Sequence, residues 1–324
     1  MGKQTPATHS RVGITRAEWL QMFPERAARP GAGGDASYTR IDGRGGREIT
    51  SIDRSLLLCG DARELLRLLP SDSVQTVVTS PPYWSLRDYD TDGQIGRDDS
   101  LSEYVASIVG AFGELKRVLR DDGTVWLNVG DAFTSGNRRY RAPDRKNRAR
   151  AMSVRPPTPE GLKPKDLIGL PWRLAFGLQD AGWWLRSEVI WHKPNAHPES
   201  VRDRPTKAHE TLFLLSKSQN YHYDVHAVQG PNGRRLRTVW DIPTEPGQCL
   251  NGQAGDHPAP MPLSLARRCL MLTGSENGVV LDPYAGSGTT LLAARELGRR
   301  WVGIELNPAF VDLIEHRMGA DGPG

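Results

Sequence analysis

The sequence is poor in the features that mark secreted, membrane and metal-binding proteins. Its three cysteines, Cys59, Cys249 and Cys269, are widely spaced and odd in number. This pattern argues against a disulfide framework and a cysteine metal site, and it is typical of a reducing cell interior. No apolar run is long enough to cross a bilayer, and residues 1–10 lack the charged and apolar segments of a secretion signal. We therefore expect a soluble, cytoplasmic protein with no membrane partner and no bound metal.

A strong excess of charge of one sign is also missing. The formal net charge of the 324 residues is only +4, so an anionic partner must be sought in local basic clusters. The chain is long enough for one large α/β domain or two smaller ones with a sizeable core. The 34 glycines and 24 prolines indicate many loops.

The first 50 residues differ in character from the rest of the chain. Residues 27–49 are rich in glycine, arginine and alanine and have no apolar period, which predicts a flexible segment. Ahead of it, Thr15 and Glu18 have the spacing of a capping box before an apolar group, which predicts a short helix that ends at Pro24. We expect a flexible N-terminal extension with one short helix over residues 1–50, and a folded domain over residues 51–324.

Within residues 51–324, short apolar strands alternate with amphipathic helices. The expected strands cover residues 56–58, 74–79, 124–129, 185–191, 211–215, 279–281 and 301–305. The expected helices cover residues 61–69, 100–119 behind a capping box and ended by Gly123, 166–179, and 290–297 ended by Gly298. This alternation predicts an α/β fold with a mainly parallel sheet and helices on both faces.

A glycine-rich turn joins the last predicted strand–helix pair. Residues 282–290 read Asp-Pro-Tyr-Ala-Gly-Ser-Gly-Thr-Thr, and glycines there let the backbone turn its N–H groups toward a ligand. Glu305 ends the next strand, where an acid commonly holds ribose hydroxyls. The third glycine of the dinucleotide fingerprint and the Gly-Lys-Ser/Thr of a P-loop are both missing. The pattern favours another nucleoside-containing cofactor, and the alternative is a turn that binds nothing.

A second motif, Thr-Ser-Pro-Pro-Tyr-Trp over residues 79–84, lies at the carboxyl end of a predicted strand, where ligands bind in open α/β sheets. Its two prolines fix the backbone and remove two N–H donors. The Ser80 hydroxyl and the Pro81 carbonyl suit the two N–H groups of an amino group on an aromatic ring, and Tyr83 and Trp84 offer flat faces. The alternative is a rigid loop without a catalytic role.

Together, and in this order, the two motifs resemble the amino-methyltransferases of bacterial restriction-modification systems. The order resembles the permuted β group, in which the catalytic motif precedes the cofactor motif. The similarity covers about residues 55–318 and includes the segments 165–173, 191–195 and 207–210. It implies the Rossmann-like α/β fold of S-adenosylmethionine-dependent methyltransferases over residues 51–324, with DNA methylation at the nucleoid of a bacterial cytoplasm as the function.

The resemblance also implies roles for individual residues. The cofactor would be S-adenosyl-L-methionine, bound by Asp61 at its adenine, by Glu305 at its ribose, and by Thr79, Asp282, Gly286, Gly288 and Thr289. The catalytic residues would be Ser80, Pro81, Pro82 and Tyr83. Members with serine at the first catalytic position commonly make N4-methylcytosine, whereas aspartate or asparagine there usually accompanies N6-methyladenine. We therefore expect cytosine N4 as the target, and adenine N6 stays open. None of the three cysteines follows a proline, as the nucleophile of a C5-cytosine enzyme would.

Double-stranded DNA is the expected partner, and the target base must leave the helix to reach the site. Residues 138–155 hold eight arginines and lysines, and the phosphate contacts expected there include Arg138, Arg139, Arg145 and Lys146. Trp84 is expected to contact DNA by stacking, and the inserted loops 134–160 and 229–256 are expected to face DNA. Three alternatives stay open: a merely solvated basic loop, an RNA or protein-amide substrate, and a silent DNA-binding regulator. The apolar group Trp19, Leu20 and Phe23 suggests a homodimer.

Overall fold

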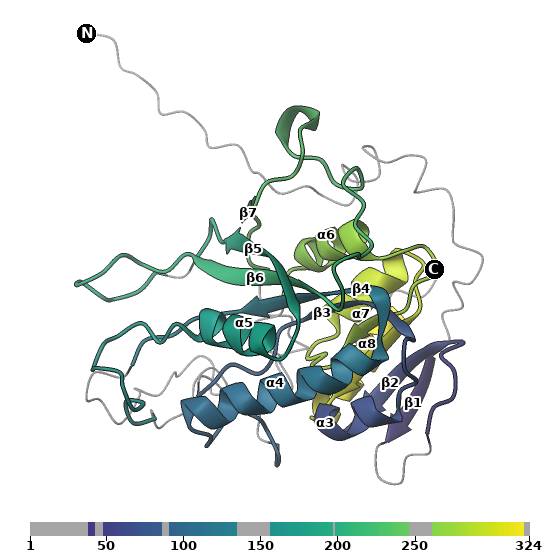
Figure 1. Cartoon of the computed structure of the whole chain (residues 1–324), viewed down its shortest axis with the longest axis horizontal. Helices are drawn as coiled ribbons and strands as arrows, with labels where there is room; N and C mark the ends of the chain where they lie inside the picture. The colour runs from purple at the N-terminus through teal and green to yellow at the C-terminus, as the bar shows by residue number, and fades with distance from the viewer. Residues whose placement is uncertain are drawn as a thin grey trace.

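The fold is one nine-stranded sheet covered by helices on both faces (Figure 1). The computed structural model describes residues 38–42, 48–85, 91–134, 156–196, 198–245 and 261–320. Within these ranges the strand order is β1-β2-β9-β8-β3-β4-β6-β5-β7. The strands are β1 Tyr38–Asp42, β2 Ser55–Cys59, β3 Val74–Thr79, β4 Leu119–Val129, β5 Trp184–His192, β6 His209–Ser216, β7 Val239–Asp241, β8 Val280–Asp282 and β9 Trp301–Glu305. Strand β6 is antiparallel to β4 and β5, and the other neighbours are parallel, so the predicted mainly parallel sheet is confirmed.

Two apolar cores separate the sheet from its helices. Side chains alternate between the faces of a strand, so that Val77 of β3 enters one core and Val78 enters the other. Helices α3 (Ala62–Leu65), α4 (Leu101–Val118) and α5 (Leu170–Asp180) pack into the first core. Helices α6 (Leu263–Thr273), α7 (Thr289–Glu296) and α8 (Pro308–Ala320) pack into the second. Short 3₁₀ turns lie at Leu66–Leu68 and Pro231–Gly233.

The connections diverge between β3 and β8, which are neighbours in the sheet. From β3 the chain crosses through α4 to β4, whereas from β8 it crosses through α7, on the opposite face, to β9. Such a divergence leaves a crevice at the carboxyl ends of the two strands, which is where open α/β sheets bind ligands. Both sequence motifs follow these strands.

The long helix α4 begins as the sequence predicts and ends earlier. Ser100 Oγ accepts from the backbone N–H of Glu103, and the Glu103 carboxylate accepts from the backbone N–H of Ser100, which completes the capping box. The predicted end at Gly123 is wrong. Leu119 has extended dihedral angles and pairs with Val74 of β3, so it starts β4 and does not extend the helix.

Residues 38–42 correct the expected N-terminal extension. They form the edge strand β1, paired in parallel with β2, whereas the sequence predicts a flexible segment there. The Tyr38 ring packs against Trp301 at 5.4 Å between centroids, and Arg40 forms an ion pair with Glu315 of α8. The folded domain therefore includes residues ahead of position 51. The predicted helix around Trp19, Leu20 and Phe23 lies outside the described residues.

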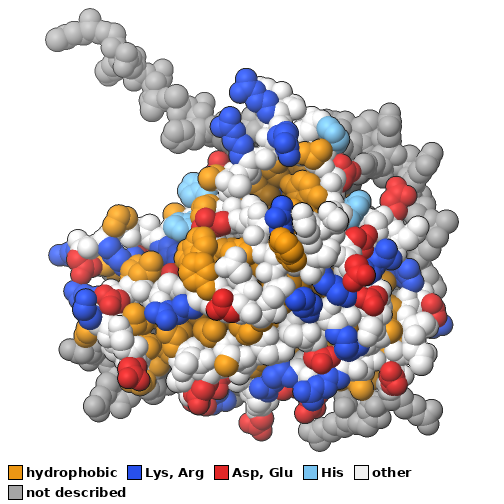
Figure 2. Space-filling model, viewed as in Figure 1, with side chains coloured by type: hydrophobic (Ala, Val, Ile, Leu, Met, Phe, Trp, Pro, Cys, Tyr) orange, Lys and Arg blue, Asp and Glu red, His pale blue; other side chains and the backbone are white. Residues whose placement is uncertain are grey.

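Basic and acidic side chains are interspersed on the face of the molecule in Figure 2, in line with the small net charge. A single basic face is not visible in this view. Among the helices that the structure describes, none is long and apolar enough to cross a membrane.

Candidate active site

The catalytic and glycine-rich motifs meet at the crevice between β3 and β8. Thr79 Oγ1 donates a hydrogen bond of 2.7 Å to Asp282 Oδ1, and Thr290 Oγ1 donates to the Val78 carbonyl at 3.1 Å. These contacts join residues about 200 positions apart in the chain and are buried. The structure therefore brings together the two motifs that the sequence analysis treats as one site.

The turn after β8 depends on glycine at two positions. Gly286 and Gly288 have φ angles of +54° and +77°, a region that disfavours side chains. A Cβ atom on Gly288 would lie 2.9 Å from Ile314 Cγ1 of α8. Gly288 is also the N-cap of α7, so the turn leads directly to a helix N-terminus. This arrangement leaves backbone N–H groups near the crevice, as expected for a cofactor cradle.

Glu305 closes this cradle from the end of β9. Its Oε2 accepts from Gly286 N at 2.7 Å and its Oε1 accepts from Asn307 N at 2.9 Å. Burial raises the pKa of Glu305 to about 7, and burial likewise raises the pKa of Asp282 to about 6. Each Glu305 oxygen keeps acceptor capacity for a hydroxyl donor, which fits the predicted ribose contact.

Asp61 and Thr289 also lie around the crevice, with side chains already engaged. The backbone N–H of Gly60 donates to the Glu305 carbonyl at 2.9 Å, which places Asp61 beside the cradle. The Asp61 carboxylate caps α3 and accepts from the backbone and guanidinium of Arg63. Burial raises the pKa of Asp61, but the hydrogen bonds from Arg63 outweigh burial, so the pKa is lowered. Thr289 Oγ1 lies 3.4 Å from Arg317 Nη1 of α8.

The catalytic turn holds two candidate acceptors, the Ser80 hydroxyl and the Pro81 carbonyl. Ser80 Oγ can donate to the Asn128 carbonyl at 3.3 Å or to Tyr83 Oη at 3.4 Å, and either bond leaves its lone pairs to accept. The Pro82 carbonyl accepts from Tyr104 Oη at 2.8 Å and is therefore used in the core. Of the two proline carbonyls, that of Pro81 remains the candidate for substrate.

The two aromatic residues of the turn have different environments. Trp84 is only 5% exposed, belongs to the core, and donates from Nε1 to the Asp99 carbonyl at 2.8 Å. Most of Trp84 is therefore buried in the core, although it also lines part of the pocket beside Tyr83, and its predicted stacking on DNA stays a prediction. Tyr83 is half-buried and lines a pocket of about 170 Å³.

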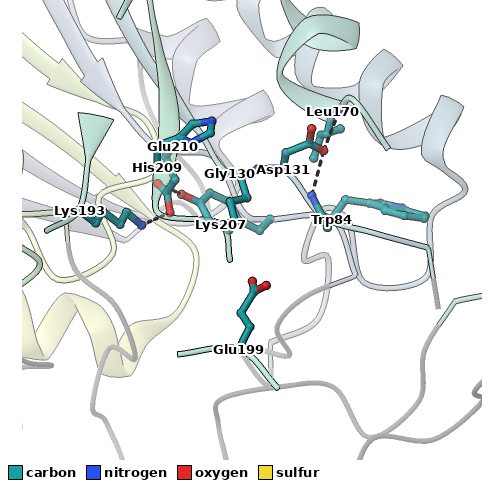
Figure 3. A pocket seen from close by; sticks show the side chains of 11 residues that line it. Trp84, Gly130, Asp131, Leu170, Lys193, Glu199, Lys207, His209 and Glu210 are labelled. Atoms are coloured by element: carbon teal, nitrogen blue, oxygen red, sulfur yellow. Dashed lines mark hydrogen bonds and ion pairs between the residues drawn. The ribbon is translucent and has the colours of Figure 1, made fainter. Parts of the chain in front are cut away.

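This pocket contains polar residues to which the sequence analysis gives no role. Its lining includes Lys193, Lys207 and Glu210, from the segments 191–195 and 207–210 (Figure 3). Glu210 accepts from Tyr83 Oη and from Asn128 Nδ2, each at 2.7 Å, and from Lys193 Nζ. The only sequence signal for this group was the motif resemblance, because Tyr83, Asn128, Lys193 and Glu210 are far apart in the sequence and meet only where strands β3 to β6 and their adjoining turns come together.

The remaining expected site residues are the basic residues of the loop 134–160 and the three cysteines. Arg138, Arg139, Arg145 and Lys146 lie outside the described residues, as do Cys249 and most of the loop 134–160. Cys59 and Cys269 are free thiols, and burial raises the pKa of each, which disfavours a thiolate nucleophile.

Comparison with known proteins gives matches along most of the chain. A family model described as DNA methylase matches residues 74–316. Type II methyltransferase M.Cfr9I of Citrobacter freundii is 53% identical over 275 residues, which cover 84% of this chain and 90% of that protein. Type II methyltransferase M.SmaI of Serratia marcescens is 52% identical over 268 residues, which cover 81% and 90%.

Solved structures match over a similar span. The PvuII DNA methyltransferase, cytosine-N4-specific, aligns with a TM-score of 0.66 at 20% identity, over 86% of this chain and 92% of that chain, which is a likeness of fold. TTHA0409, a putative DNA modification methylase of Thermus thermophilus complexed with S-adenosyl-L-methionine, aligns with a TM-score of 0.59 at 28% identity, over 83% and 95%. The predicted Rossmann-like methyltransferase fold is therefore confirmed.

Proposed function

Because the chain belongs to the N6/N4 family of DNA methylases and is a DNA methyltransferase, we propose that it methylates the exocyclic N4 amino group of cytosine in duplex DNA. The observation that carries the choice of target is Ser80 at the first catalytic position, with its hydroxyl hydrogen donated to the Asn128 carbonyl or to Tyr83 Oη. A neutral hydroxyl in this state acts as an acceptor without having to ionise. The proposed partner is the DNA duplex, in a bacterial cytoplasm.

The cradle formed by the Gly286–Gly288 turn and Glu305 fits S-adenosyl-L-methionine. Glu305 would hold the ribose hydroxyls, Asp61 would lie at the adenine, and Thr79, Asp282, Gly286, Gly288 and Thr289 would surround the methionine end. The left-handed glycines and the buried carboxylate that accepts from two backbone N–H groups support this assignment. S-adenosyl-L-methionine, with which the related TTHA0409 was solved, supplies an activated methyl group on a sulfonium.

The catalytic turn supplies acceptors for the amino group. The nitrogen lone pair of a cytosine amino group is delocalised into the ring and is a poor nucleophile. Hydrogen bonds from its two N–H groups to Ser80 Oγ and the Pro81 carbonyl would favour a pyramidal nitrogen with a localised lone pair. Fixed acceptors of this kind act through electrostatic preorganisation and orientation, and no covalent intermediate is needed.

A flipped base would enter the pocket beside Tyr83. Extrusion of a base costs a few kcal/mol, and stacking on an aromatic ring offsets part of that cost. Both aromatic residues of the turn line this pocket, and Tyr83 is the more exposed of the two, which favours it for this role. The residues that read the recognition sequence would come from the loops 134–160 and 229–256, and a homodimer stays a prediction.

Methyl transfer to long duplex DNA of unbiased sequence tests this function. The purified protein is incubated with radiolabelled cofactor, and the DNA is digested to nucleosides and separated. The proposal predicts that the label migrates with N4-methyldeoxycytidine. Label in N6-methyldeoxyadenosine would instead support the alternative target, and transfer to RNA but not to duplex DNA would contradict the proposed substrate.

A further inference from the structure

The segments 191–195 and 207–210 meet beside the catalytic turn because β5 and β6 pair in antiparallel fashion. In this register Trp191 is opposite Glu210 and His192 is opposite His209. The end of β5 and the start of β6 therefore lie on the same side of the sheet as the carboxyl ends of β3 and β4. Figure 3 shows the Lys193 side chain reaching toward Glu210 at this edge.

The Glu210 carboxylate accepts hydrogen bonds from Tyr83 of the catalytic turn and from two residues close to that turn, Asn128 and Lys193. Its Oε2 accepts from Tyr83 Oη and Asn128 Nδ2 at 2.7 Å, and its Oε1 accepts from Lys193 Nζ at 2.5 Å. The Glu210 side chain is only 14% exposed. A carboxylate with so little contact with water is costly unless it is paired. Lys193 opposes the effect of burial on the pKa of Glu210 most strongly, and the hydrogen bonds from Tyr83 and Asn128 act in the same direction.

The same contacts fix the ring of Tyr83. Its hydroxyl is held by Glu210, and its edge lies against Gly130, where a Cβ atom would approach Tyr83 Cε2 to 3.0 Å. Asn128, which donates to Glu210 from its side chain, also accepts from Ser80 Oγ through its carbonyl. One network therefore contacts both ends of the segment from Ser80 to Tyr83.

We propose that Glu210 and Lys193 form a positioning pair, which fixes the Tyr83 ring and the Ser80 acceptor in the geometry that amino-group methylation requires. Neither residue donates to or accepts from the reacting nitrogen. This inference rests on the proposed function only in requiring methyl transfer to an amino group, and it holds for cytosine and adenine alike.

The first experiment compares Glu210→Gln, Tyr83→Phe and the double variant by single-turnover methylation of duplex DNA. Each single variant is expected to lower the methylation rate by roughly tenfold to hundredfold, because small misplacements of reacting groups cost about that much. Cofactor affinity and thermal stability are expected to change little in Tyr83→Phe, which removes one oxygen atom. Because both changes weaken the same hydrogen-bond network, the double variant should lose little more than either single variant.

The chain provides a matched control at the opposite edge of the sheet. Tyr38 Oη donates to Glu315 Oε1 at 3.2 Å, and Arg40 pairs with the same carboxylate. Glu315→Gln and Tyr38→Phe therefore disrupt a tyrosine–glutamate–cation group far from the catalytic turn, and the methylation rate should stay at the wild-type value. Wild-type rates in Glu210→Gln, or multiplied losses in the double variant, would overturn the proposal. Absence of methyl transfer by the wild-type protein would instead overturn the proposed function itself.

A pH profile of Lys193→Met separates positioning from simple support of the fold. Burial raises the pKa of Glu210, and Lys193 reverses that effect, so the pKa is lowered in the intact pair. Without Lys193 the pKa of Glu210 should rise, because burial is then opposed only by the hydrogen bonds from Tyr83 and Asn128, and the methylation rate should fall toward acidic pH and recover as pH rises. The other titratable or charged groups around it in the described pocket are Tyr83, Asp131, Glu199, Lys207 and His209. A rate loss with the wild-type pH profile would contradict the pairing.

Discussion

In the proposed reaction, Ser80 is the residue on which methyl transfer depends most directly. Its hydroxyl hydrogen is donated to the Asn128 carbonyl or to Tyr83 Oη, so the oxygen would meet the substrate amino group as an acceptor. Ser80→Ala removes one preorganised hydrogen bond at the reacting centre, which typically costs about 2.7–4 kcal/mol of barrier, or roughly a hundredfold to thousandfold in rate. Cofactor and DNA dissociation constants should hardly change. A single-turnover rate within about threefold of wild type would remove Ser80 from the reaction.

The proposed contact of Glu305 with the cofactor ribose predicts that cofactor affinity depends on pH. Its pKa is raised to about 7 by burial, so much of the ligand-free protein carries a protonated Glu305 near neutral pH. Ribose hydroxyls donate best to the ionised form, and cofactor affinity should therefore rise between about pH 6 and pH 8. Calorimetry of S-adenosyl-L-methionine binding across this range measures the effect. Glu305→Gln should bind more weakly and lose the pH dependence, and a flat wild-type profile would contradict the assignment.

The same carboxyls make the ligand-free fold sensitive to pH in a defined direction. Glu305 and Asp282 have native pKa values of about 7 and about 6, above their ordinary values of 4.5 and 3.8. Between about pH 4 and pH 7 the native state therefore binds more protons than the unfolded state, and the free energy of unfolding falls as pH rises. Denaturant titrations at pH 5.5 and 7.5 should show lower stability at pH 7.5. Equal stability would argue against two buried carboxyls with raised pKa values.

The turn between β8 and α7 is the element in which sequence and geometry agree most closely. Gly288 has a φ of +77° and no room for a Cβ atom beside Ile314. Gly288→Ala should therefore destabilise the protein by roughly 1–3 kcal/mol and weaken cofactor binding, as measured by denaturant unfolding and calorimetry. Gly113→Ala in α4 is the control, since no heavy atom lies within 4 Å of its Cβ position. That change should leave stability unchanged or raise it by up to about 1 kcal/mol.

Elements that are specified by their own residues, such as apolar strands and a capping box, were predicted well from the sequence. The bounds of β3 and β9 were predicted to the residue, and Ser100 and Glu103 marked the start of α4. The end of α4 was wrong because Leu115, Val118 and Leu119 continue an apolar helical period, while the pairing of Leu119 with Val74 depends on a strand elsewhere in the chain. The edge strand β1 was not predicted for the same reason, because the contacts that stabilise it come from distant segments, by pairing with β2 and by the ion pair with α8.

The two motifs of the candidate site could be predicted from the sequence. The hydrogen-bond network around Glu210 could not. Ser80, Asp282, Gly288 and Glu305 each carry a signal in the neighbouring sequence. The bond between Tyr83 and Glu210 joins residues 127 positions apart, and no periodicity encodes such a contact. For Trp84 the sequence does not distinguish a core residue from a stacking residue, because a tryptophan suits both. Its burial becomes known only from the structure.

DNA affinity is expected to depend on the basic segment 138–155. Neutralising Arg138, Arg139, Arg145 and Lys146 together should weaken binding to all sequences and flatten the salt dependence, by roughly 0.9 in the logarithmic slope for each phosphate that is no longer neutralised. Dissociation constants measured from low to high salt give the slope. A slope equal to that of the wild-type protein would mean that these four side chains do not touch the phosphates.

Identifying the atom that receives the methyl group is the most direct test of the proposed transfer to the cytosine amino group. The protein is given duplex DNA whose cytosine amino groups carry nitrogen-15 and a cofactor whose methyl group carries carbon-13, and the product nucleoside is examined by NMR. Direct transfer to the exocyclic amino group predicts a methylated deoxycytidine with one-bond coupling between the two labels. Carbon-13 on a deoxyadenosine nitrogen would contradict the cytosine assignment, and carbon-13 on C5 of cytosine would contradict amino-group methylation altogether.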